Sequence, residues 1–566
     1  MQHNYFFHED CITESSRIVI DFKILFSLSC CQKSTHQIFF SANVFQPNNE
    51  FECEHIYRFK HARIIDLTKT TKYFNLNVFT NLERLIFSEE IKEIDIRDTS
   101  KLTYLENISY ECNTITSIID IQKCTNFRYL KYDYFEEMET LTNLQFLNCT
   151  LHSIYQNTLN FSLLSHLTTL KLILKKYGKY IYQNAIISET PQLIELVAEN
   201  INFCNTFING NKLKRMNMND VLYANISRLN RLQTMDLCSN TNVNIIYQRD
   251  SFQCLTEVKF HIGNQHALLN FRNMTNVKFL DIMRHEQFEY SNLSSLISLE
   301  KLIFEHNFEY NIDIRNLTNL TYLDFKNHVS EISNYNISLP KNIICLFYRE
   351  ECDKNDDIVS DNTWAHKILT QINSLTNLNT LCVEKLLLNQ KHWSRFRSNS
   401  LTKLTLEQCC FQIHISNFAS YKNKYFRNLL CLKDFTLDHM NMKNVDTKYL
   451  SSVTKLILED CEFMSTQQMN NFKSLEILIL RHIKYTIQFD EMPTLTNLLI
   501  RSFEQIPDVQ KLCNLKKLTL SNQRLFLELC MQKFPDSLRD IYVGINKNQE
   551  NYLSKISVKG VNLHYI

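Results

Sequence analysis

The stretch LTNLTYLDFKNHVSEI, residues 317–332, places Leu320, Leu323 and Phe325 in the order L-x-x-L-x-F. Alternation of the last two apolar residues with a polar one predicts a short strand with one buried face. One such motif decides little, but the same motif recurs along nearly the whole chain. The clearest copies are NLERLIF (81–87), NFRYLKY (126–132), NLQFLNC (143–149), RLQTMDL (231–237), NVKFLDI (276–282), SLEKLIF (298–304), NLNTLCV (377–383), SLTKLTL (400–406), SVTKLIL (452–458), SLEILIL (474–480), TLTNLLI (494–500) and NLKKLTL (514–520).

The copies follow one another at nearly fixed spacing. Leu255, Val277, Leu299 and Leu320 are the first apolar anchors of successive copies, at steps of 21 or 22 residues. A unit of this length cannot bury its apolar face alone, whereas stacked units bury a continuous core. The spacing therefore predicts a solenoid.

The motif resembles the leucine-rich repeat family, whose strand segment reads L-x-x-L-x-L-x-x-N/C-x-L. Asn240, Asn307, Cys409 and Cys461 occupy the N/C position, where the family uses the side chain to satisfy backbone groups in the turn after the strand. The resemblance covers roughly residues 62–543. It implies an α/β fold: a curved horseshoe with a parallel β-sheet on the concave face and irregular or short helical segments on the convex face.

The repeat pattern divides the chain into three parts. Residues 61–543 are expected to form the solenoid, about twenty repeats with an insertion near 349–374, and residues 544–566 a C-terminal cap. Residues 1–60 lack the repeat, so we expect an N-terminal cap there. As an alternative, residues 18–40 resemble an F-box, a helical module that binds a ubiquitin-ligase adaptor, with Ile24, Leu25, Phe26 and Leu28 matching its apolar core.

The number and spacing of the glycines argue against several classes of enzyme. The chain has five, Gly178, Gly210, Gly263, Gly544 and Gly560, and no two are close enough for G-x-G-x-x-G, a P-loop or G-x-S-x-G. H-E-x-x-H and zinc-finger spacings are also missing from the sequence. We therefore expect no catalytic residues, no metal and no cofactor.

Charge and cysteine use bear on partners and compartment. A net charge of +1 lacks the strong electrostatic signature of a nucleic-acid binder. The nineteen cysteines show no C-x-x-C spacing, which favours reduced core residues in a reducing compartment. The first residues show no secretory signal, and no early apolar run is long enough to span a membrane. We expect an intracellular, cytoplasmic protein without membrane contact, with the nucleus as an alternative; the sequence does not set the oligomeric state.

Strand alternation identifies the residues that face outward from the sheet. Between the second and third anchors this residue is mostly polar in the first half, for example Lys131 and Asp236, whereas later repeats carry Thr405, Thr436, Ile457, Ile479 and Leu499. The residue after the third anchor reads Glu407, Asp438, Glu459, Arg481 and Arg501, preceded by Glu384. An acidic row needs counter-charges, from Lys403 and Lys455 or from a basic or amphipathic partner segment.

These outward residues lead to the functional hypothesis. We expect a non-enzymatic protein-interaction scaffold that binds a partner on the concave face between about residues 378 and 520. The partner-binding residues would be Thr405, Thr436, Ile457, Ile479, Leu499, Glu407, Asp438, Glu459, Arg481 and Arg501. The alternatives are an F-box-type substrate receptor that uses residues 1–60 and, third, an enzyme whose site lies in the 349–374 insertion.

Overall fold

The structure is a computed structural model of the 566-residue chain. It describes Val44–Phe45 and most of the residues between 62 and 565, with the principal gaps at 46–61, 108–125, 263–273, 352–370, 413–425 and 545–557 and shorter ones between. The chain divides into two compact units, unit 1 (Met1–Ala267) and unit 2 (Leu268–Ile566).

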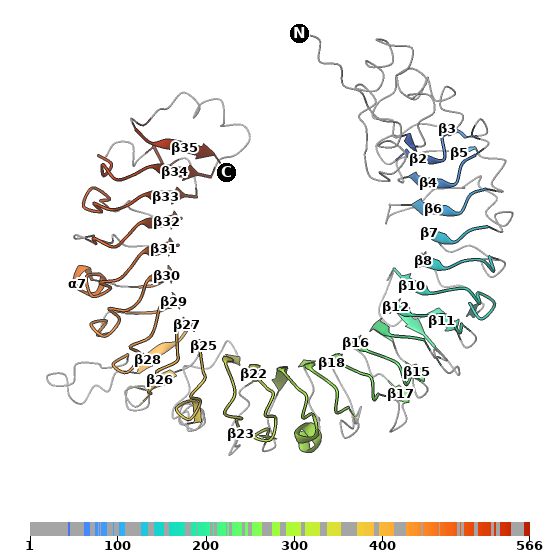
Figure 1. Cartoon of the computed structure of the whole chain (residues 1–566), viewed down its shortest axis with the longest axis horizontal. Coiled ribbons are helices and arrows are strands. Elements are labelled where there is room, and N and C mark those ends of the chain that lie inside the picture. The colour runs from blue at the N-terminus through green and yellow to red at the C-terminus, as the bar shows by residue number, and fades with distance from the viewer. Residues whose placement is uncertain are drawn as a thin grey trace, which may run out of the picture. The chain divides into compact units, whose positions relative to one another are not determined.

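Unit 1 contains a parallel sheet in which neighbours follow chain order (Figure 1). Its strands are β1 (Val44–Phe45), β2 (Ile64–Leu67), β4 (Arg84–Phe87), β6 (Tyr104–Asn107), β7 (Tyr129–Asp133), β8 (Phe146–Leu151), β10 (Thr169–Leu174), β12 (Glu195–Glu199), β14 (Arg215–Asn219), β16 (Thr234–Ser239) and β18 (Glu257–Ile262). The return segments add short parallel pairs: β3 (Phe74–Asn75) with β5 (Ile94–Asp95), β11 (Gln183–Ile186) with β9 (Leu159–Asn160) and β13 (Ile201–Asn202), and β15 (Tyr223–Asn225) with β17 (Asn244–Ile246).

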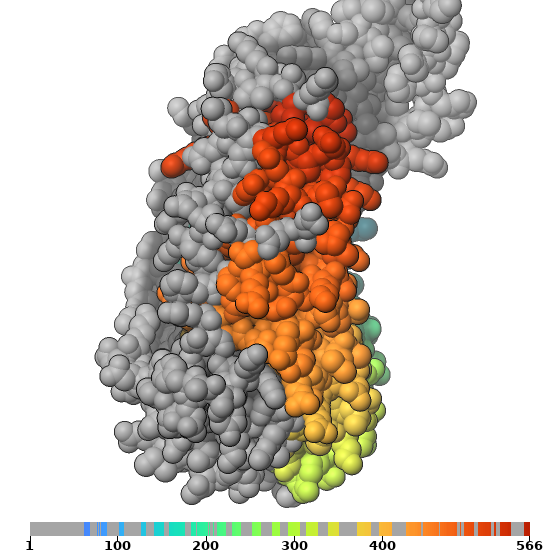
Figure 2. All heavy atoms as spheres, turned by 90° about the vertical axis from the view of Figure 1, so that its left-hand side faces the viewer, coloured from blue at the N-terminus to red at the C-terminus, as the bar shows by residue number. Residues whose placement is uncertain are grey.

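Unit 2 repeats this arrangement. Its sheet contains β19 (Phe279–Met283), β20 (Lys301–His306), β22 (Tyr322–His328), β24 (Cys345–Glu351), β25 (Thr380–Glu384), β27 (Lys403–Glu407), β29 (Asp434–Asp438), β30 (Lys455–Glu459), β31 (Ile477–Arg481), β32 (Asn497–Arg501), β33 (Lys517–Leu520), β34 (Asp540–Val543) and β35 (Asn562–Tyr565). Shorter pairs join β21 (Ile312–Asp313) to β23 (Ile337–Ser338) and β26 (Leu387–Asn389) to β28 (Cys410–Gln412). The described residues of unit 2 form a band that runs from yellow-green to red in Figure 2.

The core is a stack of the predicted anchors. In the repeat of β30 the anchors Val453, Leu456 and Leu458 are fully buried, whereas Ile457 between them is half-buried on the sheet face. The same alternation marks the neighbouring strands. Burial of a leucine side chain contributes about 1.5–3 kcal/mol, so the anchor ladders are the main stabilising feature of each unit.

The turn after the strand explains how a glycine-poor chain folds this way. His439, Asp460 and His482 each follow a strand and adopt a left-handed conformation, with φ of 49°, 46° and 52°. The amide of His439 donates to the carbonyl of Glu459 (2.9 Å), and that of His482 to Arg501 (2.9 Å). Each turn therefore continues the hydrogen-bond ladder into the next repeat, which offsets the cost of a left-handed non-glycine residue.

A second ladder lies at the opposite end of the strands, at the residue before the first anchor. Asn319 Nδ2 donates to the carbonyl of Ile297 (2.9 Å), and Ser452 Oγ to that of Leu432 (3.0 Å). These short polar side chains satisfy backbone acceptors of the preceding repeat.

The structure is a parallel β-solenoid with very little helix. In the described part of the chain, the helices with defined bounds are the 3-10 helix η5 (Tyr290–Ser295) and α7 (Thr466–Met469). The expected α/β mix and short helical return segments are therefore not a general feature of the described return segments, which consist mainly of turns and the short strand pairs. None of the described helices is long and apolar enough to cross a membrane.

Several predicted features lie wholly or partly outside the described residues. Of the N-terminal part, 1–60, only Val44–Phe45 is described, so the F-box-like segment 18–40 is not. Residues 352–370 of the predicted insertion also lie outside. Beyond residue 543, β35 pairs in parallel with β34, so the sheet continues into the segment predicted as a C-terminal cap.

Candidate functional site

Outward-facing residues of unit 2 form a continuous column of β-branched and apolar side chains on the sheet face, here called the apolar column. Thr405, Thr436, Ile457, Ile479 and Leu499 occupy the same register position on the successive strands β27, β29, β30, β31 and β32. Each side chain is half-buried. The three large members therefore lie beside one another with part of their surface open.

The same position in unit 1 is predominantly polar. Along neighbouring strands from β6 to β18 it is occupied by Glu106, Lys131, Asn148, Lys171, Val197, Asn217, Asp236 and Lys259. Val197 is a single apolar residue between polar neighbours. A contiguous apolar run at this position is thus a property of the later repeats.

A charged column runs beside the apolar column. Its members are aligned in register on the strands from β25 to β32: Glu384, Glu407, Asp438, Glu459, Arg481 and Arg501. Neighbouring parallel strands are about 4.8 Å apart, so successive carboxylates repel one another unless cations intervene.

The two outer acids of this column have cationic partners. Arg481 Nη1 lies 2.9 Å from Glu459 Oε2. Glu384 lies 3.9 Å from Arg349 Nε and 3.6 Å from Lys385 Nζ. The sequence left the source of the counter-charge open between Lys403 and Lys455 and a basic or amphipathic partner segment. Lys455 instead pairs with Asp434 (3.3 Å), and Lys403 forms no ion pair with another described residue.

The middle acids are less compensated. The pKa of the Glu407 carboxyl is raised, first by partial burial and then by repulsion from Glu384 and Asp438, which Arg349 and His439 oppose. Asp438 has His439 as its partner, with Nδ1 at 2.6 Å from Oδ1. Within the described residues, Glu407 has no salt bridge. The charged column therefore has an electronegative centre at Glu407 and Asp438.

The turn that ends this column carries the side chains of a repeat family. Cys409 Sγ donates to the carbonyl of Val383 (3.4 Å), and Cys461 Sγ to that of Leu437 (3.3 Å). Both thiols are buried at the predicted N/C position and satisfy backbone groups of the preceding repeat. The fold is that of a leucine-rich repeat protein.

Comparisons with known proteins gave structural matches only. No protein-family model and no curated protein matches the chain. An internalin (inlF) from Listeria monocytogenes is 12% identical, covering 63% of this chain and 85% of its own, with a TM-score of 0.31. The functional domain of InlJ from Listeria monocytogenes is 12% identical, covering 77% and 76%, with a TM-score of 0.37. A leucine-rich repeat protein of Leptospira interrogans is 13% identical, covering 92% and 99%, with a TM-score of 0.28.

The leucine-rich repeats bring one set of possible metal ligands together in the described part of the chain. Ligand atoms of Asp438, His439 and Asp460 lie within 4.8 Å of one another. His439 directs Nδ1 to Asp438 (2.6 Å) and Nε2 to Asp460 (3.7 Å), and its side chain is half exposed. Asp438 holds Nδ1 by a hydrogen bond, whereas 3.7 Å is too long for a hydrogen bond between Nε2 and Asp460. Three partly exposed groups do not by themselves define a metal site, so we assign no metal here.

The repeat cysteines are poor nucleophiles where they are buried. Burial raises the pKa of the Cys382 and Cys461 thiols to about 12. Because the thiolate is the reactive form, these two cysteines are unsuited to covalent chemistry near neutral pH.

Proposed function

We propose that the protein is an interaction scaffold that binds a protein partner on the sheet face of unit 2, across β25 to β33. The observation that carries this proposal is the alignment of the apolar column beside a charged column whose centre lacks full compensation. An apolar run that remains partly open on a sheet face is typical of an interaction surface.

The apolar column supplies the contact area in this proposal. Ile457, Ile479 and Leu499 lie on neighbouring strands, and each retains part of its surface after folding. A partner that covers them removes this surface from water, at about 25 cal/mol for each Å² of apolar area.

The charged column selects the partner. Glu407 and Asp438 favour a lysine or arginine of the partner, which relieves the repulsion between neighbouring carboxylates. Arg501, exposed at the other end, forms no ion pair with a described residue and favours an acidic group. The partner segment is therefore amphipathic, with its basic end over β27 and β29.

The state of the cysteines bears on the cellular compartment in which this interaction takes place. Among the described residues, buried Cys461 and exposed Cys431 form no disulfide. Free thiols are the state that a reducing compartment maintains, and we therefore propose an intracellular location.

A peptide-display selection on the purified full chain tests both parts of the proposal. We expect enrichment of peptides that combine large apolar residues with lysine or arginine. Selected peptides should lose binding to the Ile457→Asp, Ile479→Asp variant and weaken with Glu407→Gln, Asp438→Asn. A matched control, Ile173→Asp with Val197→Asp, places the same charges on outward positions of β10 and β12 in unit 1. Selection of acidic peptides, or equal loss in the control, would contradict the proposal.

A further inference from the structure

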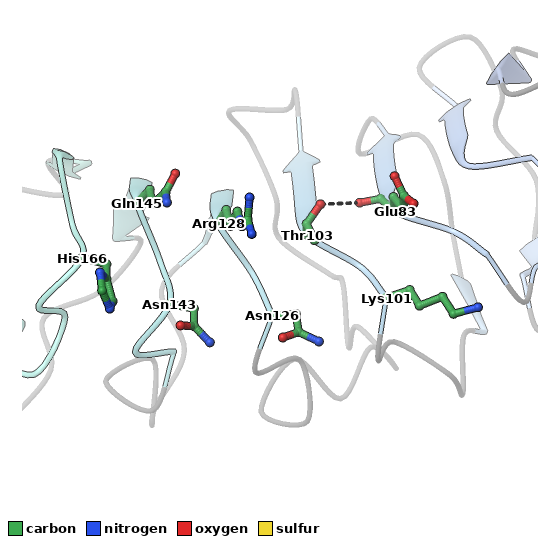
Figure 3. Close-up of a pocket in the computed structure, with 8 residues that line it drawn as sticks. All are labelled: Glu83, Lys101, Thr103, Asn126, Arg128, Asn143, Gln145 and His166. Atoms are coloured by element: carbon green, nitrogen blue, oxygen red, sulfur yellow. Dashed lines mark hydrogen bonds between the residues drawn. The ribbon is translucent and has the colours of Figure 1, made fainter. Parts of the chain in front are cut away.

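A groove of about 670 Å³ runs along one edge of the unit 1 sheet, far in sequence from the columns of unit 2. It crosses the starts of β4, β6, β7 and β8 and the turn before β10, which are neighbours in the parallel sheet (Figure 3). Figure 3 shows two rows of side chains. One row follows the first anchors (Glu83, Thr103, Arg128, Gln145), and the other precedes them (Lys101, Asn126, Asn143, His166).

The row before the anchors differs from its counterpart in unit 2. In unit 2 this position carries short polar residues such as Asn319 and Ser452, which bond to backbone carbonyls. In the groove, Lys101 and His166 replace them with longer, basic side chains. Lys101 Nζ bonds to Asn81 Oδ1 (2.6 Å), which is a neutral partner. A structural ladder does not require a lysine or a histidine at these two places.

The lining is positively charged overall. Glu83 pairs with Arg63 at 2.6 Å, so its charge is compensated outside the groove. Neither Lys101 nor Arg128 forms a salt bridge with any residue in the described part of the chain. These two side chains therefore attract an anionic ligand, and the planar guanidinium of Arg128 is suited to two-point recognition of a carboxylate.

An aromatic ladder stiffens the wall beside the groove. The rings of Tyr104 and Tyr129 stack at 3.9 Å, and those of Tyr129 and Phe146 at 4.2 Å. Arg84 covers the outer side of Tyr104, 3.9 Å from its centroid. These residues are sequence neighbours of the groove residues Glu83, Thr103, Arg128 and Gln145. Stacking covers both faces of Tyr129 and, together with Arg84, both faces of Tyr104, so the ladder holds the wall in place and we assign it no stacking role.

The length and charge of the groove indicate which class of anionic ligand fits it. The lining comes from five successive repeats, and four steps of about 4.8 Å give about 19 Å, the length of about six extended residues. A small anion fills only part of this length. A nucleic-acid strand needs many phosphate-binding cations, whereas the described lining has Lys101 and Arg128 with His166. We infer that the groove binds an extended acidic peptide segment, with carboxylates at Lys101 and Arg128 and polar groups at Gln145.

Fluorescence anisotropy with the purified full chain tests this site. The probe is a labelled octapeptide of Ser-Glu repeated four times, compared with Ser-Lys repeated four times and with an eight-nucleotide thymidine strand. We expect saturable binding of the acidic peptide alone, which weakens as salt rises. The Lys101→Gln, Arg128→Gln variant should lose about tenfold in affinity, equivalent to about 1.4 kcal/mol.

The chain offers a closely matched control. Lys212 and Lys214 hold the same two positions about Leu213 in a later repeat, and Lys212 Nζ bonds to a neutral side chain, Gln192, at 2.5 Å. Lys212→Gln with Lys214→Gln removes the same charge and should leave binding within about twofold of wild type, which is less than 0.6 kcal/mol. Lys101→Arg with Arg128→Lys, which keeps both charges, should retain most of the affinity.

Three results would overturn the inference: no binding of the acidic peptide to wild type, equal losses in the test and control variants, or tighter binding of the thymidine strand. Each variant's circular dichroism is compared with wild type, and the charge-preserving variant separates loss of charge from loss of fold. Because the Ile457→Asp, Ile479→Asp variant leaves the groove intact, it should bind the acidic peptide normally. Failure at one surface therefore leaves the other proposal untouched.

Discussion

Arg481 Nη1 lies 2.9 Å from Glu459 Oε2 on the neighbouring strand, and this contact ends the acidic part of the charged column. Both side chains are about one-third exposed, at 36% and 29%. Glu459 is thereby compensated within the protein, whereas Glu407 and Asp438 remain at the electronegative centre. The ion pair thus helps to define where a partner's cation is expected to bind.

Replacement of Arg481 by Gln tests the strength of this pair. We expect the free energy of unfolding to fall by about 0.2–1 kcal/mol, because partly exposed ion pairs contribute little in water. The loss, measured by urea denaturation, should shrink in 1 M NaCl. Arg501→Gln is the control, since Arg501 forms no ion pair with a described residue; its loss should not lower stability, because it removes the repulsion between Arg501 and Arg481. Equal effects of both variants would contradict this reading.

Glu407→Gln should stabilise the protein near neutral pH. The pKa of Glu407 is raised in the folded chain, mainly by burial and then by Glu384 and Asp438, so ionisation costs more there than in the unfolded chain. This carboxyl favours folding at low pH, and the contribution is lost as the pH rises through the folded pKa.

The pH dependence of the melting temperature checks the sign. Glu407→Gln should melt higher than wild type at pH 7, and the difference should vanish below about pH 4, where the unfolded carboxyl is also protonated. Glu476→Gln removes the same charge at an exposed position in the same unit and should show no such trend. A lower melting temperature for Glu407→Gln at pH 7 would rule out the assignment.

The two faces of β30 should respond differently to truncation. Leu456 is fully buried, so Leu456→Ala should cost about 2–5 kcal/mol of stability through the lost contacts and the cavity. Ile457 is half-buried, so Ile457→Ala should cost less than about 1 kcal/mol. Urea denaturation of both variants measures the difference, and similar losses would show that the outward assignment of Ile457 is wrong.

The left-handed turns should tolerate glycine but not proline. His482 has φ of 52° and donates its amide to Arg501 at 2.9 Å. His482→Gly keeps both features and should stay within about 1 kcal/mol of wild type. His482→Pro removes the donor and forces a negative φ, so its melting temperature should fall well below that of the glycine variant. Equal melting temperatures would mean that this turn does not stabilise the ladder.

The sequence was sufficient to predict the repeat, its strands and the side of the sheet on which each strand residue lies. Leu456, Ile457 and Leu458 show why: alternation in a strand leaves only one register in which the leucines reach the core. The alignment of both columns followed from the same rule. The role of Cys409 and Cys461 in the turn also agrees with the resemblance to leucine-rich repeats.

The sequence pattern did not predict which side chains form ion pairs with each other. Lys455 reaches Asp434 instead of the acidic column, a choice between two nearby carboxylates that strand register alone does not decide. The groove at Lys101 and Arg128 was missed because its lining comes from five repeats at positions outside the outward columns. Return segments lack a regular apolar period, so their turns and short strand pairs in place of helices were not predicted.

The central claim is that a protein partner binds the apolar column of unit 2. Its most direct test is affinity capture from native cell lysate with wild type, the Ile457→Asp, Ile479→Asp variant, the Ile173→Asp, Val197→Asp control and a chain lacking residues 1–60, each checked for folding by circular dichroism. We predict a specific partner that is lost with the first variant alone. A partner retained by that variant but lost with residues 1–60 would contradict the claim and favour the adaptor-binding alternative.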